Sequence, residues 1–143
     1  MREILFRGKR VDNGEWVEGY YSCRPFISGY EHVITNYREL KRHKGISSIE
    51  YQMNYNEVIP KTVGQYTGLC DKNGKKIFEG DILRERYGEH MHEDFCMEYV
   101  KSSAGFHAIY IPTRQIKFSF YYGAGEVIGN IHDNPELLKG GAE

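Results

Sequence analysis

Apolar residues in this chain come in short runs that alternate with polar ones, and glycine, proline or asparagine separates one run from the next. An alternation with a period of two is typical of β-strands. Pro60 favours a sheet edge, because proline cannot donate a hydrogen bond to a neighbouring strand. In the first part of the chain the pattern predicts strands at residues 5–11, 15–21, 30–35, 46–53 and 57–63.

Polar segments between the runs are predicted to be loops, at residues 22–29 and 88–95. Residues 36–45 are either one helical turn or an exposed loop. Near the end of the chain, residues 134–138 suit a single helical turn, with Asn134 as its cap and Pro135 at its first position. Strands are predicted at residues 81–87, 96–101, 106–111, 116–122 and 126–131.

Two Asn-Gly pairs mark hairpin turns, Asn13-Gly14 and Asn73-Gly74. A type I′ turn needs a positive φ at both central residues, which Asn and Gly tolerate, so we expect that turn at Asn73-Gly74. The step from Gly80 into the strand at residues 81–87 is similar to the first strand of SH3-like barrels. Many short strands, glycine at the joints and no long amphipathic helix together predict an all-β barrel or sandwich.

Six short motifs lie at the two ends and the centre of the chain. In chain order they are Arg2-Glu3-Ile4-x-Phe6-Arg7, Gln-Tyr-Thr-Gly-Leu at 65–69, Asp-x-Asn-Gly-Lys at 71–75, Glu-Gly-Asp-Ile at 79–82, Val-Ile-Gly-Asn-Ile at 127–131 and Asn-Pro-Glu-Leu-Leu at 134–138. With these motifs the chain resembles the YopX family of phage and prophage proteins. No settled biochemical activity comes with the family.

The resemblance implies an SH3-like β-barrel in the C-terminal half, preceded by a smaller β unit. We therefore expect an N-terminal β subdomain at residues 1–57 and a barrel subdomain at residues 58–143. The residues at family-typical positions are interpreted as structural, and turn chemistry explains Asp71 and Asp81 among them. They are Gly68, Asp71, Asn73, Gly74, Gly80, Asp81, Gly129, Asn130, Asn134 and Pro135.

Composition narrows the function classes. The 143 residues fit one domain or two small subdomains, and 12 Tyr with 7 Phe suit half-buried sheet surfaces. A net charge of -1 argues against a non-specific coat on DNA. No apolar run approaches a membrane span, and the start of the chain lacks the apolar region of a signal peptide. Three distant cysteines, Cys23, Cys70 and Cys96, indicate reduced thiols in a cytosolic protein. The resemblance to phage proteins implies that this is the cytosol of a bacterial host.

One local basic patch stands out, Arg38, Lys41, Arg42 and Lys44, with Tyr37 as a stacking face. His43 and Tyr30 lie close to it in sequence. Phosphate charges combined with exposed aromatic rings are typical of nucleic-acid binding. The same residues also fit a protein partner or a plain solvated surface.

Candidate catalytic chemistry is sparse. His90 and His92 lie two residues apart in a polar segment, which suits either zinc ligands on one side of a strand or a solvated loop. Ser102-Ser103 has no histidine placed beside it by the sequence, and Gly123 to Gly125 lacks the Lys-Ser/Thr of a phosphate loop. His107 and His132 fit core or rim positions. We expect no catalytic residue, no cofactor and no metal.

Three functional hypotheses follow. The first is a non-catalytic phage- or prophage-type β protein that binds or self-assembles, because open strand edges favour association. Its expected partners are further copies of itself or a host or phage protein, with no membrane. The second is a nucleic-acid-binding SH3-like module that uses the Arg38 to Lys44 patch. The third is a metal-dependent hydrolase at His90 and His92.

Overall fold

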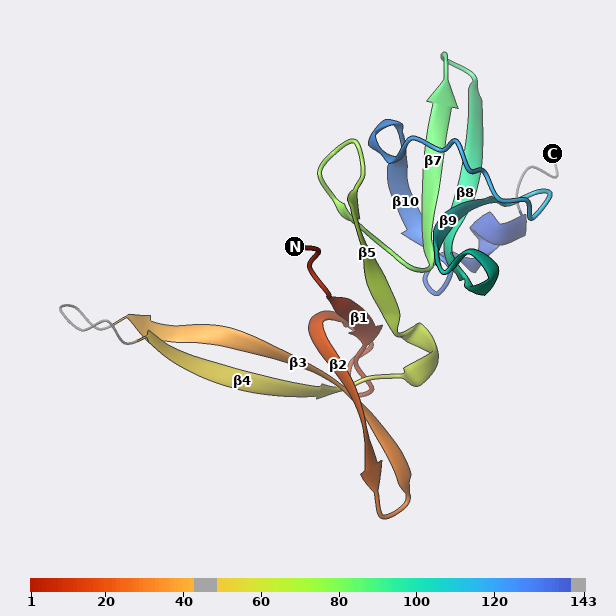
Figure 1. Ribbon diagram of the computed structural model, residues 1–143. Coiled ribbons are helices and arrows are strands. Elements are labelled where there is room, and N and C mark those ends of the chain that lie inside the picture. Colours follow the sequence, from red (N-terminus) through yellow and green to blue (C-terminus); the bar gives the residue numbers. More distant parts are fainter. Residues whose placement is uncertain (43–48, 140–143) are drawn as a thin grey trace. The chain divides into compact units, whose positions relative to one another are not determined.

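The computed structural model describes residues 1–42 and 49–139 of the chain (Figure 1). Contacts divide the chain into two units, one of residues 4–65 and the other of residues 1–3 with residues 66 onward. The boundary expected between residues 57 and 58 lies inside the first of these units. The helices of the described residues are short 3₁₀ turns, and none of them is long and apolar enough to cross a membrane.

The first unit is an antiparallel sheet in the order β4-β3-β2-β1-β5. Strand β5 (Gly64–Cys70) carries the chain out of this unit, and its first two residues pair with β1. The other elements are β1 (Phe6–Lys9), β2 (Trp16–Phe26), β3 (Gly29–Arg42), β4 (Ile49–Glu57) and the 3₁₀ helix η1 (Pro60–Thr62).

A small apolar cluster lies where these strands cross. Ile34 and Val58 are fully buried, and Gly8 faces both of them. Gly19 of β2 lies so close to β3 that a Cβ atom would overlap the Thr35 carbonyl oxygen. Glycine is therefore needed at residue 19 for the two backbones to approach.

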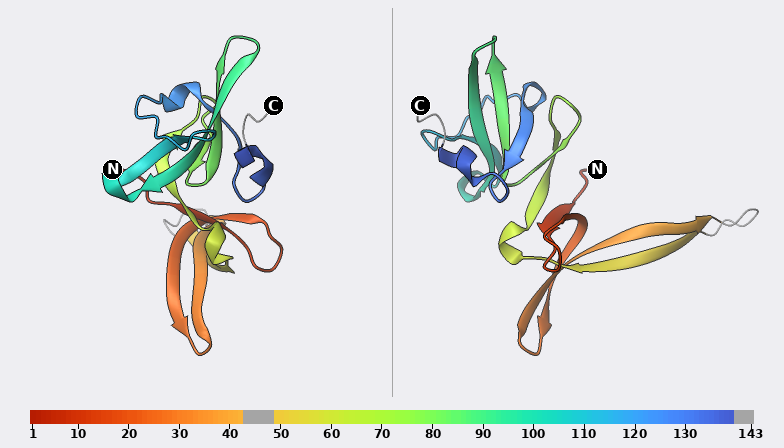
Figure 2. Two further views of the ribbon diagram at one scale, coloured as in Figure 1. Left: turned by 90° about the vertical axis from the view of Figure 1, so that its right-hand side faces the viewer. Right: turned by 180° about the vertical axis from the view of Figure 1, so that it is seen from behind.

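Strand β3 changes neighbours along its length. Residues Gly29 to Thr35 pair with β2, and residues from Val33 onward pair with β4. Beyond Thr35 the two strands run on as a ribbon with no third strand paired to it in the described residues (Figures 1 and 2). We call residues 33–42 with residues 49–57 the β3–β4 ribbon.

The second unit holds a four-stranded antiparallel sheet in the order β10-β7-β8-β9. Strand β6 pairs instead with the later part of β5. The elements are β6 (Lys76–Phe78), β7 (Asp81–Tyr87), β8 (Met91–Val100), η2 (Lys101–Ser103), β9 (Gly105–Tyr110), η3 (Tyr122–Ala124), β10 (Glu126–Asn130) and η4 (Pro135–Lys139).

Both faces of this sheet are covered. Leu83 pairs with Phe95 on one face, and Ile82 pairs with Cys96 on the other. Each of these four side chains exposes at most 2% of its surface. The first face packs with Ile77, Met97, Ala108 and Phe120, and the second with Ile111, Ile128, Ile131 and Leu137.

The all-β class predicted from the sequence is confirmed. The finer expectation of a closed SH3-like barrel is not confirmed, because the described strands form open sheets. In the four-stranded sheet β10 and β9 are the two edges, and no described pairing joins them. The SH3-like barrel stays a prediction.

Three predicted loops are wrong, because strands run through them. Residues 22–26 continue β2, so that only Ile27 and Ser28 separate β2 from β3. Residues 36–42, predicted to be a helical turn or a loop, continue β3, while residues 43–45 lie outside the described part. Strand β8 begins at Met91, within the predicted loop 88–95. These segments carry polar residues on both faces. The alternation of apolar and polar residues, which marks a strand with one buried face, therefore cannot detect them.

The strand predicted at residues 116–122 is also wrong. Only Ile116 forms a bridge, to Ile109 of β9. The chain then turns so that Phe120 enters the core, where its ring centroid lies 4.8 Å from that of Phe95. Pro60 does not lie at the edge of a strand either, since it begins the 3₁₀ helix η1.

The Asn73-Gly74 hairpin forms with a different turn from the one expected. Asn73 has no positive φ, and Gly74 alone is left-handed at +79°. The Gly74 N–H donates to the Asp71 carbonyl at 3.0 Å, and the Asp71 N–H donates to the Lys75 carbonyl at 2.8 Å. This is a type I turn followed by a left-handed glycine, the common three-residue hairpin loop.

The turn after β10 depends on a close approach of Asn134 to Gly129. The Asn134 N–H donates to the Asn130 carbonyl at 2.8 Å, and Asn134 Oδ1 accepts from the Asn130 N–H at 3.2 Å. Asn134 was expected to cap the helical turn that follows, but its Oδ1 bonds back to Asn130 instead. The turn itself is confirmed as the 3₁₀ helix η4, with Pro135 as its first residue.

We predict that Gly129→Ala destabilises the protein. The added Cβ would overlap Asn134 Oδ1 and lie 2.8 Å from Asn134 Cγ, so the turn has to move. The expected loss in the free energy of unfolding is about 1–3 kcal/mol, read from the midpoint of urea unfolding. Gly105→Ala is the matched control, because its Cβ meets nothing closer than 3.8 Å. Equal midpoints for Gly129→Ala and the natural chain would contradict this account of the turn.

Candidate functional site

The basic patch predicted from the sequence lies on the β3–β4 ribbon. Tyr37 and Arg38 belong to β3 and are exposed. Lys41 and Arg42 end the same strand, but their side chains lie outside the described part, as does Lys44 altogether.

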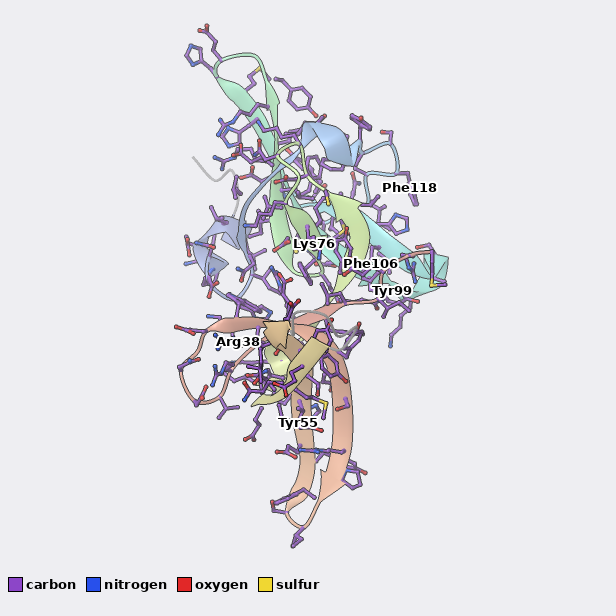
Figure 3. All side chains as sticks on the ribbon, turned by 90° about the vertical axis from the view of Figure 1, so that its left-hand side faces the viewer. Arg38, Tyr55, Lys76, Tyr99, Phe106 and Phe118 are labelled. Atoms are coloured by element: carbon purple, nitrogen blue, oxygen red, sulfur yellow. The ribbon has the colours of Figure 1, made fainter. Side chains whose placement is uncertain are left out.

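The ribbon separates the two residues of the patch whose side chains are described. Tyr37 pairs with Met53, while Arg38 pairs with Gln52. Residues directly opposite each other share a face, and successive residues along a strand point to opposite faces. Tyr37 and Arg38 therefore lie on opposite faces of the ribbon. Figure 3 labels Arg38 of β3 and Tyr55 of β4 among the side chains of this unit.

One face of the ribbon carries large exposed side chains. The register places Tyr37 beside Met53, Tyr51 beside Glu39, and Tyr55 beside Thr35, whose other neighbour is Tyr20 of β2. Each of the four tyrosines exposes more than half of its surface, and Met53 exposes 42%. We call Tyr20, Tyr37, Tyr51, Met53 and Tyr55 the aromatic face.

A cationic and an anionic side chain lie at the base of the aromatic face. The Arg24 guanidinium lies 5.5 Å from the centre of the Tyr55 ring, within the range of a cation–π contact. The same guanidinium donates to Glu31 Oε2 at 2.9 Å. These contacts hold the Tyr55 ring in place on the sheet while leaving it 56% exposed.

The opposite face is polar. Asn36, Asn54 and Asn56 are half-buried there, and two of their amides are used within the unit. Asn36 Nδ2 donates to the Glu18 carbonyl, and Asn56 Nδ2 donates to the Ile34 carbonyl, both at 3.1 Å. An open groove of about 600 Å³ lies alongside, lined by these asparagines with Arg10, Glu15, Trp16, Val17, Met53 and Tyr55.

Sequence reasoning missed the aromatic face, although its signal is visible. Tyr51, Met53 and Tyr55 alternate with polar residues at a period of two. The prediction ended one strand at Met53 and began another at Glu57, which broke this alternation between two elements. The structure runs β4 without interruption to Glu57.

The structure does not gather the histidines into a ligand set. His90 lies in the turn between β7 and β8 and is nearly fully exposed. His92 Nε2 lies 4.0 Å from Asp94 Oδ2, but Arg84 binds both oxygens of that carboxylate, at 2.8 and 2.9 Å. Among the described residues, no three His, Cys, Asp or Glu side chains lie close enough together to hold a metal ion.

A serine and a histidine do meet, contrary to the expectation that no histidine is placed beside Ser103. Ser103 Oγ lies 2.7 Å from His107 Nε2, across the turn that begins β9. Glu98 lies opposite His107 in the sheet, but its carboxylate bonds to Arg114 at 2.5 Å. Within the described residues no carboxylate orients His107, so the pair lacks the third member of a catalytic triad.

Asp71 joins segments that are far apart in sequence. Its Oδ1 accepts from the N–H groups of Asn73 and Lys75 at 2.8 and 2.9 Å, the local turn contacts that the sequence predicted. Its Oδ2 accepts from the Val127 N–H of β10 at 2.9 Å. Burial of the carboxyl acts to raise its pKa, but these three bonds outweigh burial and hold the pKa below the ordinary value.

Asp81 also has a structural role. It is 1% exposed, and its Oδ2 accepts from the Phe78 N–H at 2.8 Å. Gly80 before it has a φ of +87°, donates to Met97 and accepts from Ile131. Both aspartates therefore hold backbone turns of the second unit, and neither is placed for catalysis.

Comparisons with known proteins identify a family for this chain and a solved structure that it resembles. The family model described as YopX protein matches residues 5–139. Among solved structures the chain is similar to protein EF1440 from Enterococcus faecalis. The two share 27% identity with a TM-score of 0.54, over 96% of this chain and 99% of that one. No curated protein matches the chain.

We predict that Asp71→Asn lowers the free energy of unfolding by roughly 2 kcal/mol at neutral pH, because an amide cannot accept all three N–H bonds. The folded pKa of Asp71 lies below its unfolded value of about 4. The carboxylate therefore stabilises the fold above that value, and its contribution is lost as the pH falls through the folded pKa.

The measurement is urea unfolding of the natural chain and of Asp71→Asn from pH 7 down to pH 3. The difference in the free energy of unfolding should shrink at the acid end. A difference that stays constant over the whole range would show that the charge of Asp71 does not contribute.

Proposed function

The chain belongs to the YopX family, and from that premise we propose that it is a non-catalytic binding module that acts through the aromatic face of the β3–β4 ribbon. Its setting is a phage or prophage, and its place is the cytosol of the bacterial host. Family membership brings no activity with it, so the proposal rests on the surface itself.

The observation that carries the proposal is the exposure of Tyr37, Tyr51, Met53 and Tyr55 on one face of two paired strands. Large apolar patches on soluble proteins are typical of interaction surfaces. Tyrosine and methionine are also enriched at protein interfaces, where the tyrosine ring is buried and its hydroxyl stays hydrogen-bonded.

The outer ribbon also needs support that its own unit does not give. A two-stranded ribbon is marginally stable in water, because few of its side chains can be buried. Packing a partner against the aromatic face would bury the tyrosines and hold the ribbon in one conformation. This requirement supports binding as the role of the ribbon.

A protein partner fits this surface better than a nucleic acid does. Stacking on bases while holding phosphates requires rings and cations on the same face. Tyr37 and Arg38 lie on opposite faces, and the nearest neighbour of Tyr51 on the aromatic face is Glu39. The Arg24 guanidinium does lie beside the Tyr55 ring, but it is already paired with the Glu31 carboxylate. The aromatic face therefore combines rings with a carboxylate, which a phosphate backbone would repel.

We predict that the aromatic face can be cross-linked to its partner. A photo-reactive phenylalanine analogue replaces Tyr37 in one variant and Tyr99 in a control. Tyr99 is 47% exposed but lies on the other unit. Illumination of cells that express each variant should give a discrete adduct at residue 37 and none at residue 99.

The mass of the adduct identifies its class. A multiple of the 16.7 kDa chain indicates a second copy, another protein mass a separate partner, and nuclease sensitivity a nucleic acid. The absence of any adduct at residue 37 above the level at residue 99 would overturn the proposed binding role, and a nuclease-sensitive adduct would overturn the choice of a protein partner.

The non-catalytic part of the proposal makes a separate prediction. Without a carboxylate on His107, Ser103 Oγ should remain a weak nucleophile. A fluorophosphonate probe should therefore label the natural chain no faster than Ser103→Ala, as measured by mass spectrometry of the intact protein. Labelling that depends on both Ser103 and His107 would show an activated serine, and the module would then be an enzyme.

A further inference from the structure

The outer edge of β4 is a backbone edge of the ribbon with which no described strand pairs along its middle. Strand β4 lies at the end of its sheet, with β3 on one side only. Its far end is covered, because the Val11 N–H donates to the Glu57 carbonyl at 3.0 Å and Arg10 bridges Val58. No described strand pairs with the outer edge between Glu50 and Asn56.

The direction in which the backbone groups of β4 point follows from the hydrogen bonds of Glu57 and Val58. The Val58 N–H donates inward to the His32 carbonyl, while the Glu57 carbonyl accepts from Val11 on the outer side. Successive residues of a strand alternate in the direction of their N–H and C=O groups. The outward groups on the free edge therefore belong to Tyr55, Met53 and Tyr51.

This edge lacks the features that keep edge strands apart. From Glu50 to Asn56 the sequence is EYQMNYN, which contains no proline and no lysine. The one irregularity of the ribbon is on β3, between Glu39 and Lys41, so β4 itself runs without a bulge. Long, flat edges with exposed apolar side chains favour pairing with another strand.

The edge is also complementary to itself. An antiparallel pairing of two copies with Met53 at its centre places each Tyr51 opposite the other copy's Tyr55. Glu50 then lies opposite Asn56, so that no like charges face each other. The outward groups of all three central residues meet, and each opposed pair exchanges two backbone hydrogen bonds.

We propose that the β4 strands of two copies of this chain pair antiparallel across a two-fold axis at Met53. The ribbon then becomes the four-stranded sheet β3-β4-β4-β3, which meets the need for more than two strands. Because the axis is perpendicular to the sheet, both aromatic faces lie on the same side of it. This inference rests on the proposed binding role and names a second copy as the ribbon's first partner.

The first test places like charges on the axis. In Met53→Lys the two introduced lysines face each other directly, and like charges in opposed positions repel. We therefore expect the dissociation constant of the dimer to rise about tenfold or more. Gln52→Lys is the control, since its lysine would face Asn54 on the polar side. Sedimentation equilibrium measures both variants, and circular dichroism checks that each is folded.

The second test reads the register. In the double variant Tyr51→Lys, Tyr55→Glu, each introduced lysine faces an introduced glutamate of the other copy. We expect this variant to stay dimeric, with a dissociation constant that rises with salt. A parallel pairing would instead oppose lysine with lysine and glutamate with glutamate, and a shift by one residue would break both charge pairs.

The outcomes separate this inference from the proposed function. A dimer that responds to Met53→Lys but not to Gln52→Lys supports the β4 pairing. A dimer that Met53→Lys leaves intact overturns the pairing. A monomer at every concentration overturns it as well, whereas the cross-link from residue 37 to a different protein would still support the binding role.

Discussion

Every strand has N–H and C=O groups along both of its edges that need hydrogen-bond partners. In this protein some strands are paired along both edges and others along one. Strands β7 and β8 have a neighbour on each side, and the side chains of residues 81–83 and 95–97 are buried on both faces. The outer half of β3 pairs with β4 alone, and both faces of that ribbon meet solvent. The need to pair and cover a strand is therefore met within the four-stranded sheet, and we propose that a partner meets it at the ribbon.

In the second unit, buried polar side chains accept hydrogen bonds from backbone N–H groups at the turns. Asp71 binds its own turn and the start of β10, and the Asn130 side chain accepts the N–H groups of His132 and Asp133. Such groups are costly unless they are hydrogen-bonded, and the Asp71 carboxylate and the Asn130 side chain are. Asp71 and Asn130, two residues of the YopX-like motifs, thus secure turns, and we propose that recognition falls to the side chains of the ribbon.

How much the sequence predicts depends on where each signal comes from. The strand at residues 81–87 and the contacts of Asp71 within its turn are local, and both were predictable. The bond from Asp71 to Val127 and the contact of Ser103 with His107 arise from tertiary packing, which periodicity cannot show. The length of β3 was missed because a ribbon exposed on both faces has no apolar stripe to reveal it.

Residue-resolved hydrogen exchange of the amides on β4 is the most direct test of an edge that pairs with its copy. The account predicts that the N–H groups of Tyr51, Met53 and Tyr55 become protected as protein concentration rises, while those that already bond to β3 stay protected throughout. Fast exchange of the three outward amides at every concentration would contradict it.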